Sequence, residues 1–360
     1  MTTISSPRRS RFRGLVALAA IGLTAWLSNG AARAEEPDRF LGLIEPVVAT
    51  KPLRFGVTVV HLQDNYWKGM AYGIVDEAKR AGVEVVQVSV AGAYGNVSQQ
   101  FGQIQTMKTR GIDVLVLGPA AFDGYNAILT SLRKAGTMVI AGGIPVNSDQ
   151  VDFGVVQDDY SIGAGLADFV CGRKEPGPAK ALSIPGPAGA EWANLRAKGF
   201  REQAEKCDGL SVVEGPVGGA IDISYALGLA SDMMEKNPDA KFFFTPEVTL
   251  GMGAIQAAKQ RKMKIGVVSS TVSEHIFPAL EDGSLLGQST EPSILMGRLM
   301  VQYAIRKNEG LPMPDLKQPE GALYPALIVP EQILTKENVH DYPYYLTDIP
   351  PADWSISAFQ

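Results

Sequence analysis

The chain has 360 residues, with 33 lysines and arginines against 38 aspartates and glutamates, which gives a formal net charge of −5. This length is enough for two domains of about 150 residues each. The acidic balance argues against a nucleic-acid partner, because affinity for nucleic acids comes from basic patches. Only two cysteines are present, Cys171 and Cys207. They could form one disulfide or remain two separate buried thiols, and sequence spacing alone does not decide between these.

The N-terminus has the pattern of an export signal. Four arginines between positions 8 and 13 precede an apolar stretch, 14–27, and small residues end the segment at Ala34. This order is typical of a secretory signal peptide (residues 1–34), with cleavage expected after Ala34. A retained membrane anchor is the alternative, although the stretch is shorter than the roughly 20 residues of a membrane span. Loss of residues 1–34, which contain five arginines and no acidic residue, changes the formal charge from −5 to −10.

Strand and helix patterns alternate from residue 55 onward. The β-branched run at 55–60 indicates a buried strand, and apolar residues from Met70 to Ala81 recur at helical spacing. The alternation continues to residue 142 and restarts at residue 179. Apolar runs of four to eight residues between amphipathic helices indicate parallel sheets with helices on both faces. The sequence therefore predicts an α/β fold of two similar doubly wound parallel-sheet lobes.

The expected lobes are not continuous in the chain. We expect an N-terminal lobe from 50–152 plus about 272–290 and a C-terminal lobe from 153–271 plus about 291–330. A tail, 331–360, follows. No Gly/Ser linker separates the lobes, so short crossings are expected to act as a hinge.

Catalytic and metal-binding motifs are missing from the sequence. It contains neither a G-x-S-x-G nucleophile turn nor a phosphate-binding loop. The three histidines, His61, His275 and His340, do not have the spacing of metal ligands. We therefore expect no catalytic residue, no metal and no cofactor. A secreted enzyme stays as the least supported alternative.

Candidate binding residues follow the strands, because ligands of open α/β sheets bind at the carboxyl ends of the strands. Aromatic rings beside amide and carboxylate groups suit a sugar or a methylated ammonium. The candidates are Asp64, Tyr66, Trp67, Tyr94, Gln157, Asp158, Trp192, Asp222, Thr271 and Gln288. Seven of them have a structural alternative, which is packing for the four aromatic residues, helix capping for Asp158 and Asp222 and a hinge role for Gln288.

Several motifs make the chain similar to a known family. Asp64-x-Tyr66-Trp67 after the first strand and Asp158-Asp159-Tyr-x-x-Gly163 at the first crossing resemble the type I periplasmic binding proteins. The segment 64–73, with Ala91-Gly-Ala-Tyr94 and Pro185-Gly-Pro187, is similar to the TorT-like sensor proteins of trimethylamine N-oxide respiration. The likeness covers about residues 50–330.

The resemblance implies a periplasmic small-molecule receptor that docks on the periplasmic domain of a membrane histidine kinase. Tyr66, Trp67 and Tyr94 match family positions that line the pocket. At two other positions, where the family has aromatic residues, this chain has Gln157 and Thr271, and Trp192 is the candidate replacement for one of them. The expected ligand is therefore a methylated amine, an N-oxide or a sugar-like molecule. The alternative is a sugar or polyol binding protein whose partner is an ABC permease.

Overall fold

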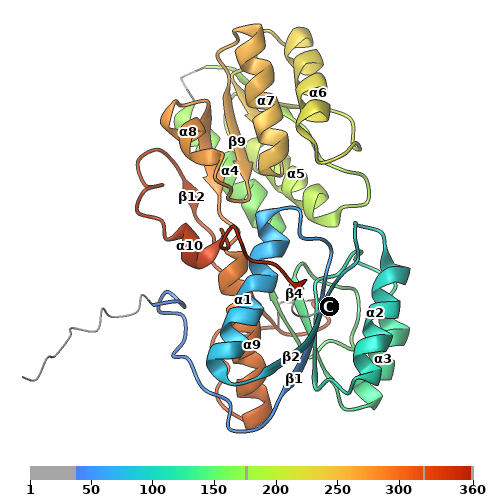
Figure 1. The fold of residues 1–360 in the computed structure, drawn as a ribbon. Helices are drawn as coiled ribbons and strands as arrows, with labels where there is room; N and C mark the ends of the chain where they lie inside the picture. The colour runs from blue at the N-terminus through green and yellow to red at the C-terminus, as the bar shows by residue number, and fades with distance from the viewer. Residues whose placement is uncertain (1–37, 175–176, 319–320, 358–360) are drawn as a thin grey trace, which may run out of the picture. The chain divides into compact units, whose positions relative to one another are not determined.

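The computed structural model describes residues 38–174, 177–318 and 321–357. The expected signal peptide and its cleavage site lie outside these ranges. The described chain forms two α/β lobes, each built around a six-stranded sheet (Figure 1). This arrangement confirms the predicted fold class. Within the described ranges, no helix combines the length and the apolarity that a membrane crossing requires.

The N-terminal lobe has the strand order β11-β5-β4-β3-β1-β2, and all these neighbours are parallel. Its elements are β1 (Arg54–Val59), α1 (Asn65–Ala81), β2 (Glu84–Val90), α2 (Val97–Thr109), β3 (Val114–Leu117), α3 (Asn126–Lys134), β4 (Met138–Gly143), β5 (Phe153–Val156), α9 (Ser293–Glu309) and β11 (Ala326–Ile328).

The C-terminal lobe has the order β12-β10-β9-β8-β6-β7, in which only the short β12 is antiparallel to its neighbour among the described strands. Its elements are α4 (Asp159–Arg173), β6 (Ala179–Ser183), α5 (Glu191–Ala204), β7 (Leu210–Glu214), α6 (Ile223–Lys236), β8 (Phe242–Phe244), α7 (Val248–Arg261), β9 (Gly266–Ser270), α8 (Ile276–Glu281), β10 (Leu285–Ser289), β12 (Ile333–Leu334) and α10 (Tyr344–Thr347).

Five elements lie in the lobe opposite to the one expected. Strands β5 and β11 belong to the first sheet and β10 to the second. Helix α8 packs on β10, while α9 packs on α1 and on the first sheet. The chain therefore crosses between the lobes after β5, after β10 and after β11. The physical reason is that the backbones of α9 and α1 lie in close contact at Gly73 and Gly297, a contact that local sequence patterns do not reveal.

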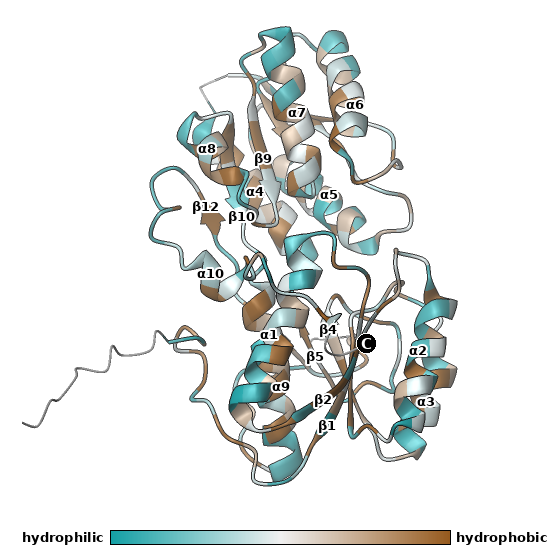
Figure 2. Ribbon diagram, in the orientation of Figure 1, coloured by the Kyte–Doolittle hydropathy of each residue, from teal (hydrophilic) through white to brown (hydrophobic). Residues whose placement is uncertain are grey.

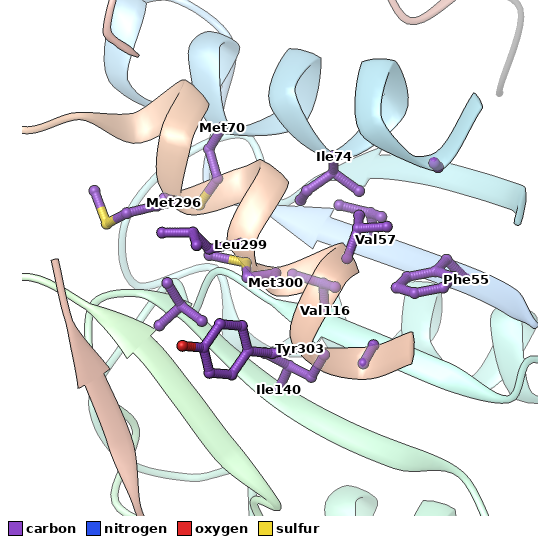
Figure 3. Close-up of a cluster of buried hydrophobic side chains, with 14 of the residues drawn as sticks. Phe55, Val57, Met70, Ile74, Val116, Ile140, Met296, Leu299, Met300 and Tyr303 are labelled. Atoms are coloured by element: carbon purple, nitrogen blue, oxygen red, sulfur yellow. The ribbon is translucent and has the colours of Figure 1, made fainter. Parts of the chain in front are cut away.

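The core of the N-terminal lobe shows why alternating strand residues face two different helix layers. Helices α1 and α9 cover one face of the sheet, and α2 and α3 cover the other (Figure 1). Figure 2 shows apolar residues along the strands and mixed polarity along these helices. In Figure 3, Met70 and Ile74 of α1 and Met300 of α9 point toward Val57 and Val116 of the sheet.

A disulfide joins Cys171 at the end of α4 to Cys207 after α5, with Cα atoms 6.0 Å apart. That separation is usual for a disulfide. The bond ties together the two helices that cover one face of the second sheet. The pairing that the sequence left open is therefore present in the structure.

The C-terminal tail, 331–357, contacts both lobes. Ile349 packs in the core of the C-terminal lobe, whereas Ile356 packs in the core of the N-terminal lobe. The Asp348 carboxylate accepts hydrogen bonds from the backbone N–H of Glu291, 3.2 Å away, and from the Tyr342 hydroxyl, 2.5 Å away. The tail therefore spans the crossing that follows β10.

Candidate functional site

A small cavity of about 30 Å³ lies where loops after the strands of both lobes converge. This volume holds about two water molecules, so the two lobes are closed on each other in this conformation. A ligand the size of an amine or a sugar requires the lobes to open before it enters. The cavity is lined by Asp64, Tyr66, Tyr94, Ile144, Gln157, Trp192, Arg196, Ile221, Glu247, Thr271 and Glu291.

The start of α1 supplies one wall of this cavity. Asp64 caps the helix by accepting a hydrogen bond from the Trp67 backbone N–H at 3.0 Å, which satisfies a donor that a helix leaves unpaired. The Tyr66 hydroxyl donates to the Gln157 side-chain oxygen at 2.8 Å. The Trp67 ring is buried against Gly118, where a Cβ would overlap it, and its indole N–H donates to the Tyr94 hydroxyl at 3.1 Å. Trp67 therefore positions Tyr94 from behind the wall.

The opposite wall is organised by Arg196 of α5, which is 1% exposed. Its guanidinium forms two hydrogen bonds to Asp159, at 2.8 and 2.7 Å, and two to Glu291, at 2.6 and 2.9 Å. It also donates to the Ser270 hydroxyl at 2.6 Å and to the Pro246 carbonyl at 2.9 Å. These partners lie at the start of α4, after β8, at the end of β9 and after β10, so one side chain connects four segments.

Burial and charge shift the pKa values of these groups. Burial raises the pKa of Asp159 to about 6, although the adjacent Arg196 opposes the rise. Burial acts to lower the pKa of Arg196, but Glu291 and Asp159 raise it more, so the guanidinium stays charged. Burial, with the negative charge of Asp64, raises the pKa of the Glu247 carboxyl to about 7. Glu247 caps α7 through the Thr249 backbone N–H at 2.8 Å.

Aromatic side chains close the cavity from both lobes. Tyr94 and Trp192 lie with ring centroids 6.3 Å apart, and the Arg196 guanidinium lies 4.9 Å from the Trp192 ring centre. Trp192 is 7% exposed, and its indole N–H has no hydrogen-bond partner among the described residues. Because a buried donor without a partner is costly, this N–H is a group that a ligand acceptor would satisfy.

The structure brings six of the ten predicted residues into the cavity wall and places four elsewhere. Asp64, Tyr66, Tyr94, Gln157, Trp192 and Thr271 line the cavity. Trp67 is in the core behind it. Asp158 and Asp222 cap helices α4 and α6, and Gln288 is fully buried and donates to the Thr271 carbonyl. For Asp158 and Asp222 the structure shows the capping contacts, and Gln288 holds the backbone that follows β9.

Sequence reasoning missed the charged members of the cavity wall, Arg196, Glu247 and Glu291. Glu247 and Glu291 lie in loops that follow strands, where ligand contacts were expected. Arg196 is four residues after Trp192 in α5, so the two lie on the same side of the helix. That spacing was the available signal, but burial of an arginine depends on partners far away in sequence. Among the described residues, no cluster of His, Cys, Asp and Glu could hold a metal ion.

The chain is similar in sequence to a family model and to known proteins. The model of the periplasmic binding protein domain matches residues 55–311. The periplasmic protein TorT of Escherichia coli strain K12 is 25% identical over 300 residues, covering 82% of this chain and 82% of TorT. This supports the predicted likeness to TorT.

Two crystal structures extend the comparison. A sugar ABC transport system substrate-binding protein from Bordetella parapertussis 12822 superposes with a TM-score of 0.84 and 46% identity, over 89% of this chain and 100% of that one. The TorS sensor domain–TorT complex without ligand matches with a TM-score of 0.72 and 21% identity, over 86% of this chain and 100% of the matched chain. At 21% identity the second match shows the fold alone. The chain therefore belongs to the periplasmic binding protein domain family and has its type I fold.

Proposed function

We propose that this chain is a non-catalytic periplasmic receptor that closes its two lobes over a small organic cation, such as a methylated amine. The observation that carries the proposal is the excess of carboxylates in the cavity wall. Asp64, Glu247 and Glu291 line the cavity, and the only lining cation among the described residues is Arg196. The guanidinium of Arg196 is already paired with Asp159 and Glu291. A bound cation would offset the charges of Asp64 and Glu247.

The aromatic rings support the same ligand class. Tyr66, Tyr94 and Trp192 line the cavity, and each cation–aromatic contact contributes about 0.5–2 kcal/mol. The unpartnered Trp192 N–H would bind an acceptor atom such as an N-oxide oxygen. Ligand contacts from both lobes would favour the closed form over the open form.

A calorimetric titration tests the ligand class. The pKa of Glu247 is raised to about 7, so part of this carboxyl is protonated near neutral pH. A bound cation would lower that pKa, and we expect protons to be released on binding at pH 7. Titrations of trimethylamine, trimethylamine N-oxide, ribose and xylitol in buffers of different ionisation enthalpy measure this release. Tight binding of a sugar without proton release would contradict the proposal, and release of a reaction product would favour the enzyme alternative.

The proposed partner is the periplasmic domain of a membrane sensor histidine kinase. The 25% identity to TorT over 300 residues supports this partner, and the structural neighbour TorT forms a complex with the TorS sensor domain. In a strain that lacks the receptor, ligand-dependent gene induction should be lost while uptake of labelled ligand continues.

A second candidate output is ligand delivery to an ABC importer. The specific observation that favours it is the 46% identity to a structure described as a sugar ABC transport system substrate-binding protein. The same deletion strain distinguishes the two outputs. Loss of labelled-ligand uptake would indicate import, and loss of induction with normal uptake would indicate signalling.

A further inference from the structure

A second, larger cavity of about 520 Å³ lies beside the buried one, and we call it the lateral groove. Its walls come from both lobes: Phe122 and Pro145 follow strands of the N-terminal lobe, Ile328 ends β11, and Glu191 and Leu195 lie in α5. Small-molecule sites usually measure about 300–1,000 Å³. In the closed conformation this groove has the volume for an organic ligand that the buried cavity of about 30 Å³ does not have.

Exposed apolar side chains line the lateral groove. Phe122 is 41% exposed, Leu323 is 49% exposed and Ile328 is 42% exposed. These three are among the nine large apolar residues that are exposed in the described part of the chain, and all three line one groove. Exposed apolar side chains that gather around a hollow mark a surface that binds another molecule. The groove therefore suits a ligand with an apolar body.

The charged residues of the groove are all acidic. Asp158, Asp159 and Glu191 line it, and its described lining contains no lysine or arginine. Arg196 offsets the charge of Asp159. Asp158 caps α4, and the side chain of Glu191 forms no hydrogen bond or ion pair with any described residue. The N-termini of α4 and α5 contribute about half a positive charge each, which leaves the groove negative.

We propose that the lateral groove is a second ligand site, which takes an amphipathic organic cation, that is, an ammonium group on an aromatic or branched apolar body. The apolar body would lie against Phe122, Leu323 and Ile328, and the ammonium group would lie near Asp158 and Glu191. The site goes beyond the proposed receptor function, since it shares only Gln157 with the buried cavity. Because both lobes form its walls, an occupant stabilises the closed conformation.

Isothermal titration of the mature full-length chain tests the charge preference. The probes are benzyltrimethylammonium, benzyl alcohol and phenylacetate at pH 7.5. We expect the cation to bind at least tenfold more tightly than the neutral or anionic probe. Equal affinity for the three probes, or no binding of the cation, would overturn the inference.

Two pairs of variants locate the binding. Leu323→Lys places a cation in the groove and should weaken benzyltrimethylammonium binding more than tenfold, whereas Leu311→Lys, at a site 37% exposed outside the groove, should not. Glu191→Gln should weaken it by about two- to fivefold, as expected for an exposed charge pair. Glu205→Gln, at the other end of α5, should have no effect.

A third variant separates this inference from the proposed function. Trp192→Ala alters the buried cavity but not the described lining of the lateral groove, so groove binding should persist. If Leu323→Lys leaves the affinity unchanged and Trp192→Ala abolishes it, the probe occupies the buried cavity. That result would overturn the second site while supporting the proposed receptor. Groove binding without any ligand for the buried cavity would leave the second site standing and count against the receptor proposal.

Discussion

Gly163 of α4 lies directly against the backbone carbonyl of Arg196 in α5, so closely that a Cβ at Gly163 would overlap that oxygen. The reciprocal contact occurs at Gly199 of α5, where a Cβ would overlap the Tyr160 carbonyl of α4. The two helices therefore touch through their backbones. This contact fixes the position from which the Arg196 side chain reaches Asp159 and Glu291.

Gly163→Ala should displace α5 and weaken ligand binding in the buried cavity. We expect a loss of about 1–3 kcal/mol in the free energy of unfolding, because the backbones must separate to admit the methyl group. Gly165→Ala in the same helix is the matched control, since its Cβ meets nothing within 4 Å. That control should be neutral or stabilising, by up to about 1 kcal/mol. Urea unfolding measures both, and equal stability of the two variants would contradict the contact.

Arg196→Met should be strongly destabilising at neutral pH. The change leaves Asp159 and Glu291 buried without their cation, and removal of one partner from a buried ion pair costs about 3–5 kcal/mol. The loss should be smaller at pH 5, where Asp159 is protonated. Arg201→Met is the control, since its pair with Glu214 is partly exposed and contributes about 0–1 kcal/mol. A loss below 1 kcal/mol for Arg196→Met would show that the network does not hold these four segments together.

Glu331, in the crossing after β11, should make the protein less stable as pH rises. Burial, with the negative charges of Asp158 and Glu291, raises the pKa of Glu331 to about 8. An unfolded glutamate has a pKa of about 4.3. Between these values the folded state binds more protons than the unfolded state, so the free energy of unfolding falls as pH rises. Above pH 8 the Glu331 carboxylate is ionised in the folded state, and the full cost of its burial lowers the free energy of unfolding.

Glu331→Gln removes this penalty. The variant should match the parent near pH 4 and unfold at a higher temperature at pH 8.5, by about 2–4 °C for each kcal/mol relieved. Glu337→Gln is a control of opposite sign, because a hydrogen bond from Thr335 lowers the pKa of Glu337. Its removal should slightly lower stability at high pH. If the melting temperatures of the parent and of Glu331→Gln change with pH in the same way, Glu331 is not responsible for the loss of stability at high pH.

Loss of the disulfide should destabilise the C-terminal lobe. Cys171 and Cys207 are 36 residues apart in sequence, and a crosslink that closes a loop of this length contributes about 3–4 kcal/mol in the chain-entropy account. Cys171→Ser with Cys207→Ser should therefore lower the melting temperature. Addition of dithiothreitol should lower the parent to the same value and leave the double variant unchanged. A parent that does not respond to the reductant would mean that the bond is not formed in solution.

The sequence by itself determined the α/β fold class, because the spacing of apolar residues along the chain predicts where strands and helices alternate. The apolar run that includes Phe55 to Val59 and the helical spacing from Met70 to Ala81 correspond to β1 and most of α1. Six of the ten predicted residues reach the cavity wall for a related reason. Parallel strands end at the same edge of a sheet, so residues that follow different strands come together.

Only the tertiary structure decided which lobe holds α9 and which groups carry the charge of the cavity. Helix α9 is buried on all sides from Ser293 to Arg306, and close backbone contact at Gly73 and Gly297 places it on α1. Arg196 meets Glu291 across 95 residues of sequence. Local sequence patterns cannot predict such a contact, because a buried charge is stable only when other groups compensate it, and here those groups are distant in sequence. The fold class therefore follows from periodicity, and the electrostatics of the site follow from how the segments assemble.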